Sequence, residues 1–186
     1  MKNNKLNLQL FAENDEVVQR YQEALYINIS PKASVPTWAL FGTGATKADE
    51  SFDAQTSDKR YINQVSTSQN VTGYVYSVEY EYDQIPSQKA IKFIDSVAKK
   101  EKVGSDAITD LVIVSMNLKK EAEKGYPARK RAVAISPDSN SDSDGSMTGS
   151  GSLLGRTDWK YGYFNVETSA FTEDAAAGAA FDVEVG

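Results

Sequence analysis

The sequence predicts a mainly β fold, an antiparallel β-sandwich or barrel with one flanking α-helix, a long loop and terminal arms. From Gly73 to Asp83, tyrosines and a valine alternate with mostly polar residues. This period of two is typical of a strand with one buried face. Residues 87–100 carry apolar side chains at helical spacing, so one amphipathic helix is expected to pack on a sheet.

The N-terminal residues 1–12 are predicted to form an arm. Their apolar side chains make a short strand-like stripe with no local packing partner: Leu6, Leu8, Leu10 and Phe11. Such a stripe docks on a partner or adds to a sheet edge, and a disordered terminus is the alternative. From Asn14, helical spacing predicts a short helix that leads into a strand beginning near Leu25.

Residues 13–170 are expected to form the domain itself, with about seven short strands in its pattern. The helix at 87–100 follows the tyrosine-rich strand, with Ser87 as its expected cap. Its predicted packing face consists of Ile91, Phe93, Ile94 and Val97.

Three stretches differ in composition from the predicted strands. Residues 42–60 are polar, with few large apolar groups beyond Phe52, and indicate a long functional loop. Residues 136–155 are rich in Ser, Asp and Gly and indicate a flexible segment. The Ala-rich residues 171–186 are expected to end in a last strand or a C-terminal arm.

Composition excludes several classes of enzyme. The 186 residues contain no His and no Cys, so histidine-based triads, thiolate nucleophiles and the usual zinc sites are absent. The 20 basic and 26 acidic residues give a net charge of −6, which argues against wrapping nucleic acid. An acidic surface past which DNA slides stays compatible with this charge. No apolar run approaches the roughly 20 residues that span a bilayer, and the N-terminal pattern does not form a secretory signal.

Two motifs are candidates for ligand binding. The run from Gly42 to Lys47 departs from a phosphate-binding loop in its spacing and in the acidic residues after it, so a flexible turn is favoured. The other motif places oxygen ligands at alternating positions, as a calcium loop does: Asp138, Asn140, Asp142 and Asp144. The twelfth position of such a loop would be Gly151, where a calcium loop has Glu. A solvated loop is therefore favoured, and weak cation binding is the alternative.

Two sets of charged residues lie on predicted strands. Ser77, Glu79 and Glu81 share one strand face, with the carboxylates about 7 Å apart by strand rise. A glycosidase pair is one interpretation, and a solvated face is favoured. Arg129 and Arg131 point to one side of a strand, where ion pairs within or between subunits are expected.

The order of several motifs resembles the major tail protein, or tail tube protein, of long-tailed non-contractile phages. The start from Lys5 to Ala12 is similar to the starts of structural proteins of phages that infect Gram-positive bacteria. The likeness covers most of residues 24–170 and includes these blocks: Thr37 to Gly44, Lys59 to Ile62, Thr72 to Tyr74, Val103 to Ala107, and Tyr126 to Ala128. The family's glycine-and-proline turn before Trp159 is replaced here by Gly155-Arg156-Thr157-Asp158.

The resemblance implies a non-enzymatic structural protein without cofactors. Six copies would form a ring whose inner sheets join into a channel, and rings would stack into the tube through which phage DNA passes. Lumen-facing candidates are Ser77, Glu79 and Glu81, and expected subunit or ring contacts are Leu6, Leu8, Leu10, Phe11, Thr43, Lys47, Phe52 and Lys59.

The expected partners are further copies and the tape measure, terminator and distal tail proteins, with no membrane. The expected location is the virion tail, after synthesis in the bacterial host cytoplasm. Alternatives are a contractile-tail or secretion-system tube, a head-decoration protein, or a carbohydrate-binding or hydrolytic β-domain that uses Glu79, Glu81 or the Asp-rich segment.

Overall fold

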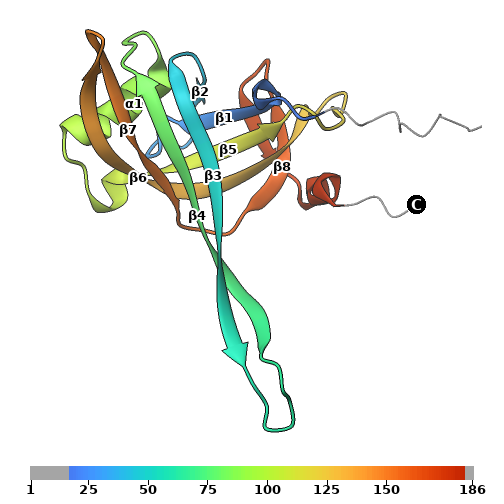
Figure 1. Cartoon of the computed structure of the whole chain (residues 1–186). Helices are drawn as coiled ribbons and strands as arrows, with labels where there is room; N and C mark the ends of the chain where they lie inside the picture. The colour runs from blue at the N-terminus through green and yellow to red at the C-terminus, as the bar shows by residue number, and fades with distance from the viewer. Residues whose placement is uncertain (1–16, 183–186) are drawn as a thin grey trace, which may run out of the picture.

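A single antiparallel sheet organises the computed structural model, which describes residues 17–182 (Figure 1). The strand order is β2-β1-β5-β6-β7-β4-β3, and β8 and β9 branch from β6. The mainly antiparallel β fold is therefore confirmed. The strands are β1 Glu23–Asn28, β2 Trp38–Phe41, β3 Ala45–Lys59, β4 Ser68–Asp83, β5 Ile108–Ser115, β6 Tyr126–Ser143, β7 Ser146–Gly155, β8 Lys160–Asn165 and β9 Ala170–Glu173.

The long strand β6 divides the sheet into two packed regions. It pairs with β5 along one edge, while its other edge pairs first with β8 and then with β7. This branching covers both faces of β5, whose residues Leu111, Val112, Ile113 and Val114 are all fully buried. One face joins the main core, and the other packs against Phe164 of β8 and Tyr26 of β1.

Helix α1 (Lys89–Lys99) covers the main core (Figure 1). Ile91, Ile94 and Val97 are buried there, and Phe93 is partly buried against the same cluster. The helix begins after Gln88 without a side-chain cap bond, so the expected cap at Ser87 is wrong. No helix in residues 17–182 is long and apolar enough to cross a membrane.

The predicted loop at 42–60 is wrong, because most of it is strand β3. β3 and β4 pair from Ala45 to Lys59, and the far half of this hairpin projects from the body (Figure 1). Residues 53–59 and 68–75, which pair with each other, have almost all their side chains exposed. A two-stranded ribbon satisfies its backbone by pairing and needs little apolar content, so polar composition did not exclude a strand.

The predicted flexible segment at 136–155 is also wrong, because it forms the β6–β7 hairpin. Asp144 and Gly145 make the turn with positive φ angles of 49° and 81°, as a two-residue hairpin requires. Gly149 lies opposite Tyr82 and Gly151 opposite Tyr80. A Cβ atom on either glycine would come within 2.5 Å of the facing tyrosine ring or hydroxyl, so the glycines make room for the two rings.

The elements predicted at the chain ends lie partly outside the described residues. Where helical spacing predicted a helix, the described residues from Val17 onward form a 3₁₀ turn at Arg20–Gln22 that leads into β1. The described part of the C-terminal stretch forms β9 and the 3₁₀ helix Ala175–Phe181, and most of the expected last strand or arm after Phe181 lies outside the described residues. The arm residues Leu6, Leu8, Leu10 and Phe11 lie outside the described residues.

Candidate assembly surface

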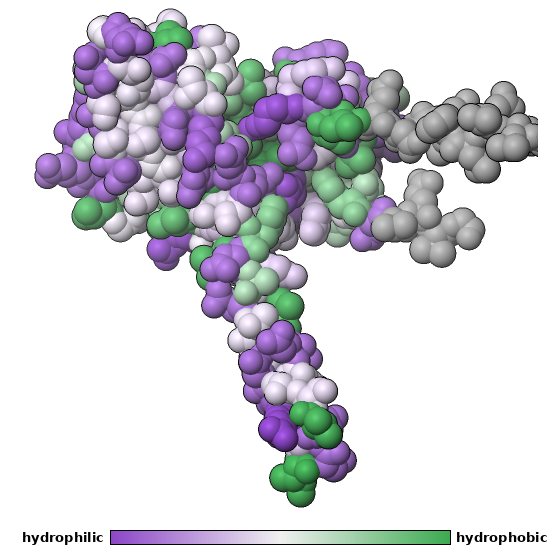
Figure 2. All heavy atoms as spheres, viewed as in Figure 1, coloured by the Kyte–Doolittle hydropathy of each residue, from purple (hydrophilic) through white to green (hydrophobic). Residues whose placement is uncertain are grey.

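The projecting hairpin, defined as residues 53–75, exposes large apolar side chains. At its tip Tyr61, Ile62 and Val65 are open to solvent, and Ile62 is fully exposed at 109%. Figure 2 shows apolar side chains at this tip, beyond a mostly polar shaft. Exposed apolar groups gathered at the end of a projection are typical of a contact surface.

Strand β3 presents a free edge along the whole hairpin. Among the described residues it pairs with β4, and its other side has no strand partner over 15 residues. Long exposed edges invite pairing with another chain, and monomeric proteins usually block them. After the apolar tip, this free edge is the second feature of the assembly surface, and a strand of another copy could pair with it.

A groove opens between the start of β3 and the start of β1. Strand β2 pairs with β1 from Leu25 onward, so Glu23 and Ala24 have no partner on that side. The groove has a volume of about 730 Å³ and is lined in part by Leu40, Phe41, Ala45, Ala48, Met116 and Val166. We call it the seam.

One side chain bridges the seam. The Arg20 guanidinium donates to the carbonyl oxygen of Glu23 at 2.6 Å and to that of Ala48 at 3.3 Å. These two carbonyl groups therefore face the seam from opposite walls. The Arg20 side chain thus occupies the position from which the backbone amides of an additional strand would donate to these carbonyl groups.

The polar face of β4 carries the predicted channel residues. Glu79 and Glu81 are exposed and Ser77 is half-buried. Asp49 of β3 lies directly opposite Glu79, an arrangement of like charges that destabilises a sheet. Lys47 relieves it through a 2.9 Å ion pair with Glu79, whose hydrogen bond raises the pKa of Lys47.

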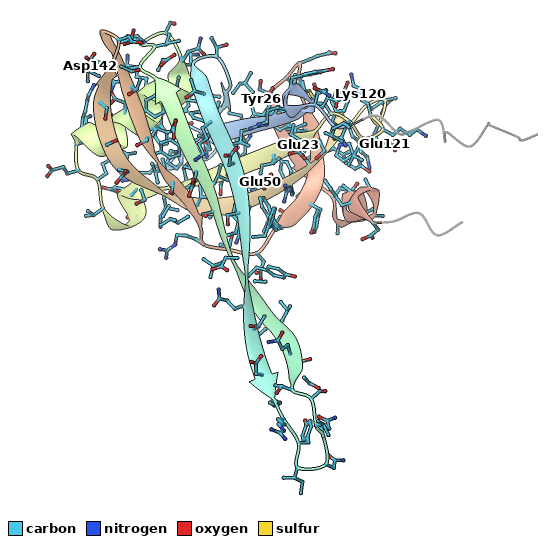
Figure 3. The ribbon with its side chains drawn as sticks, viewed as in Figure 1. Glu23, Tyr26, Glu50, Lys120, Glu121 and Asp142 are labelled. Carbon is cyan, nitrogen blue, oxygen red and sulfur yellow. The ribbon has the colours of Figure 1, made fainter. Side chains whose placement is uncertain are left out.

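A largely buried ion pair lies at the base of the projecting hairpin. Arg129 of β6 donates to both carboxylate oxygens of Glu50 on β3, at 2.8 and 2.9 Å. Tyr76 of β4 donates its hydroxyl to the same carboxylate at 2.8 Å. Figure 3 labels Glu50 where β3 crosses the body. The ion pair expected for Arg129 is therefore present within the domain. The sequence pattern of residues 42–60 did not identify Glu50 as its partner.

Aromatic rings surround this ion pair. The Arg129 guanidinium lies 4.7 Å from the Trp159 ring centroid, and Arg131 lies 4.8 Å from the same ring. Arg131 also lies 4.5 Å from the ring of Tyr76, and burial raises the pKa of that tyrosine. Cation–π contacts of this kind are strongest where water is excluded. We call Glu50, Tyr76, Arg129, Arg131 and Trp159 the hairpin clamp.

The candidate cation ligands do not form a calcium loop. Asp138, Asn140 and Asp142 lie along β6, and Asp144 is in the turn after it. Figure 3 shows Asp142 near the tip of the β6–β7 hairpin. Within residues 17–182 no group of three or more carboxylates is placed to hold a metal ion. The phosphate-loop alternative fails as well, because the turn at Gly44 leads into β3 instead of a helix.

The other predicted contact residues lie along β3 and in the turn before it. Thr43 is in the exposed turn between β2 and β3, and Lys47 lines the seam. Phe52 is half exposed beside the clamp, and Lys59 is near the tip of the projecting hairpin. The structure thus distributes these residues along β3 and its entry turn.

The fold resembles that of a protein in a solved tail structure. The chain is similar to a protein in the structure described as the tail of an empty GTA particle, refined with C6 symmetry. The TM-score is 0.53 at 9% identity, and the match covers 78% of this chain and 98% of the other. At this identity the likeness shows the fold alone, a mainly antiparallel sheet shared with a component of that tail.

Two further matches are weaker. A sheath/tube terminator structure of an extracellular contractile injection system matches with a TM-score of 0.46, at 9% identity over 80% of this chain and 98% of the other. The anti-feeding prophage cap matches with a TM-score of 0.45, at 12% identity over 83% and 99%. No family model matches the chain, and no curated protein matches it.

Proposed function

We propose that this chain is a tail tube subunit whose copies form six-membered rings that stack into a tube for DNA passage. The observation that carries the proposal is the free edge of β3 in a hairpin that projects beyond the body. A monomer leaves this edge open, whereas pairing between copies closes it. The fold shared with a tail of C6 symmetry supports the same arrangement.

The polar face of β4 is proposed to line the channel. Ser77, Glu79 and Glu81 stand beside Asp49, so the face is acidic despite the single Lys47. Like charges at Asp49 and Glu79 destabilise the sheet. A channel wall that must stay acidic would explain why both carboxylates are present. Negative charge there repels the DNA phosphates, so DNA slides without adhering.

The projecting hairpin is proposed to reach an adjacent ring. Its apolar tip at Tyr61, Ile62 and Val65 gains from burial against another copy, and Lys59 and Phe52 lie along the same ribbon. Thr43 and Lys47 provide contacts at its root. The tape measure, terminator and distal tail proteins complete the proposed assembly in the virion tail, after synthesis in the host cytoplasm.

Electron microscopy of the concentrated protein tests this function. Negative-stain images are expected to show six-fold rings or tubes. A protein that stays monomeric at high concentration, also with tail assembly partners present, would overturn the proposal. Ring symmetry and ring spacing in the same images separate a non-contractile tube from a contractile tube, a secretion tube or a head-decoration protein.

The carbohydrate alternative is less well supported by the geometry. The shallow hollow beside Glu79 and Glu81 is lined mostly by Ser, Gly and acidic residues. Tyr80 is the aromatic residue in its lining, and only 1% of this residue is exposed. Sugar binding relies on exposed aromatic faces, so this surface lacks the main element of such a site among the described residues.

A further inference from the structure

We infer that residues 5–11 of one copy add as a strand in the seam of a second copy, between the starts of β1 and β3. This inference rests on the proposed ring assembly and specifies one of its contacts. The occupant lies outside the described residues, whereas the receiving surface is fully described.

The seam has the backbone geometry of a missing strand. Its walls are two unpaired edges, at Glu23–Ala24 of β1 and at Ala45–Ala48 of β3. The carbonyl groups of Glu23 and Ala48 both face it, since Arg20 reaches both of them. A strand laid between the walls would supply amide donors on both sides, which is how extended peptides add to open sheets.

The lining of the seam matches the pattern of the occupant. Its floor and walls include the apolar side chains of Leu25, Leu40, Phe41, Met116 and Val166. In an extended segment 5–11, Leu6, Leu8 and Leu10 lie on one face and Asn7 and Gln9 on the other. The leucines would enter the groove while the amides stay in water.

The geometry of assembly identifies a second copy as the partner. Val17 lies six positions beyond residue 11, a stretch that spans about 20 Å when extended, which is enough to leave the body. A strand donated from each copy to the next makes a heterologous contact, and such contacts form a ring when the rotation between copies closes. A strand folded into its own seam would link nothing.

Cysteine cross-linking tests the contact directly, because the chain has no Cys of its own. The Leu8→Cys protein and the Ala48→Cys protein are mixed, assembled and mildly oxidised. We expect a disulfide-linked dimer from the mixture and at least tenfold less from either protein alone or from Asn7→Cys with Ala48→Cys. Intramolecular cross-linking in the Leu8→Cys/Ala48→Cys double variant, or equal yields for Asn7 and Leu8, would overturn the inference.

A charge-matched pair separates this inference from the proposed function. The variant Leu8→Asp/Leu10→Asp is expected to lose rings, while Asn7→Asp/Gln9→Asp, with the same added charge on the opposite face, keeps them. Rings that form equally well from both variants would overturn the seam contact and leave the tube function standing. A wild-type protein without rings under any condition would instead overturn the proposed function itself.

Discussion

Glu50 and Arg129 are 79 residues apart in the chain and form an ion pair at the base of the projecting hairpin, in which the Arg129 Nη2 atom lies 2.8 and 2.9 Å from the two carboxylate oxygens. The side chains are 13% and 16% exposed, so water screens the pair little. The pair joins β3 to β6 across the body, beside the ring of Trp159. It therefore fixes the direction in which the hairpin leaves the sheet.

Replacing Glu50 by Gln should destabilise the fold by about 3 kcal/mol, because it leaves the Arg129 charge buried without its partner. Chemical denaturation measures the change in the free energy of unfolding. Glu79→Gln is the control, because its ion pair with Lys47 is largely exposed and should contribute little. Equal losses in the two variants would contradict a specific role for the buried pair.

The tyrosine–glycine pairs give a prediction about packing. Gly151→Ala should cost about 1–3 kcal/mol, because the added methyl group would meet the Tyr80 hydroxyl and the Ser136 carbonyl oxygen. Gly73→Ala is the matched control, since a Cβ atom there meets nothing within 4 Å. Thermal or denaturant unfolding of both variants measures the difference. Similar stabilities would contradict the prediction, because they would show that the Tyr80 ring shifts to accommodate the methyl group.

The Tyr80 hydroxyl itself should be dispensable for folding. It is buried without a hydrogen-bond partner in the described structure, so Tyr80→Phe removes an unsatisfied polar group. We expect unchanged or increased stability in the same denaturation experiment. Tyr76→Phe is the comparison, because it deletes the 2.8 Å bond to Glu50 and should destabilise. A loss in Tyr80→Phe as large as that in Tyr76→Phe would contradict the interpretation.

The sequence predicted those elements whose burial shows in their own pattern. The alternating tyrosines of β4 and the apolar stripe of α1 indicated a sheet with one flanking helix, because both bury one face in the core. β3 and the β6–β7 hairpin were missed, since their pairing depends on backbone bonds and on glycines opposite tyrosines. Glu50 was missed for the same reason: its partner Arg129 is distant in the chain, and neighbouring residues carry no trace of the contact.

The hairpin tip should matter for assembly and not for folding. Ile62→Asp and Val65→Asp change side chains that are 109% and 94% exposed, so the free energy of unfolding should stay the same. Ring or tube formation should fall sharply, because the added charge opposes burial against another copy. Light scattering and negative-stain images measure assembly. Asn63→Asp adds the same charge in the same turn and should assemble normally; an equal loss there would point to charge alone.

Acid should loosen the C-terminal 3₁₀ helix. A hydrogen bond from Lys124, with a second from the Ala176 amide, holds the pKa of Asp174 below its usual value of 3.8. A carboxyl with a lowered pKa stabilises the fold above its unfolded pKa, and this contribution is lost as the pH falls through the folded pKa. The protection of the amides in Ala175–Phe181, relative to unstructured peptide at the same pH, should therefore fall below pH 3.8. In Asp174→Asn this step should vanish, and a step that persists would assign it to another group.

Reversing the charge of the proposed channel wall should make assembled tubes bind DNA. The variant Glu79→Lys/Glu81→Lys places two lysines on the exposed face of β4, where phosphates could release counterions on contact. Short duplex DNA should cosediment with these tubes at low salt, lose binding steeply as salt rises, and stay unbound with wild-type tubes. Glu121→Lys/Glu123→Lys makes the same change in net charge in an exposed turn away from β4. If both variants bind DNA equally, net charge explains the binding and the β4 face does not line the channel.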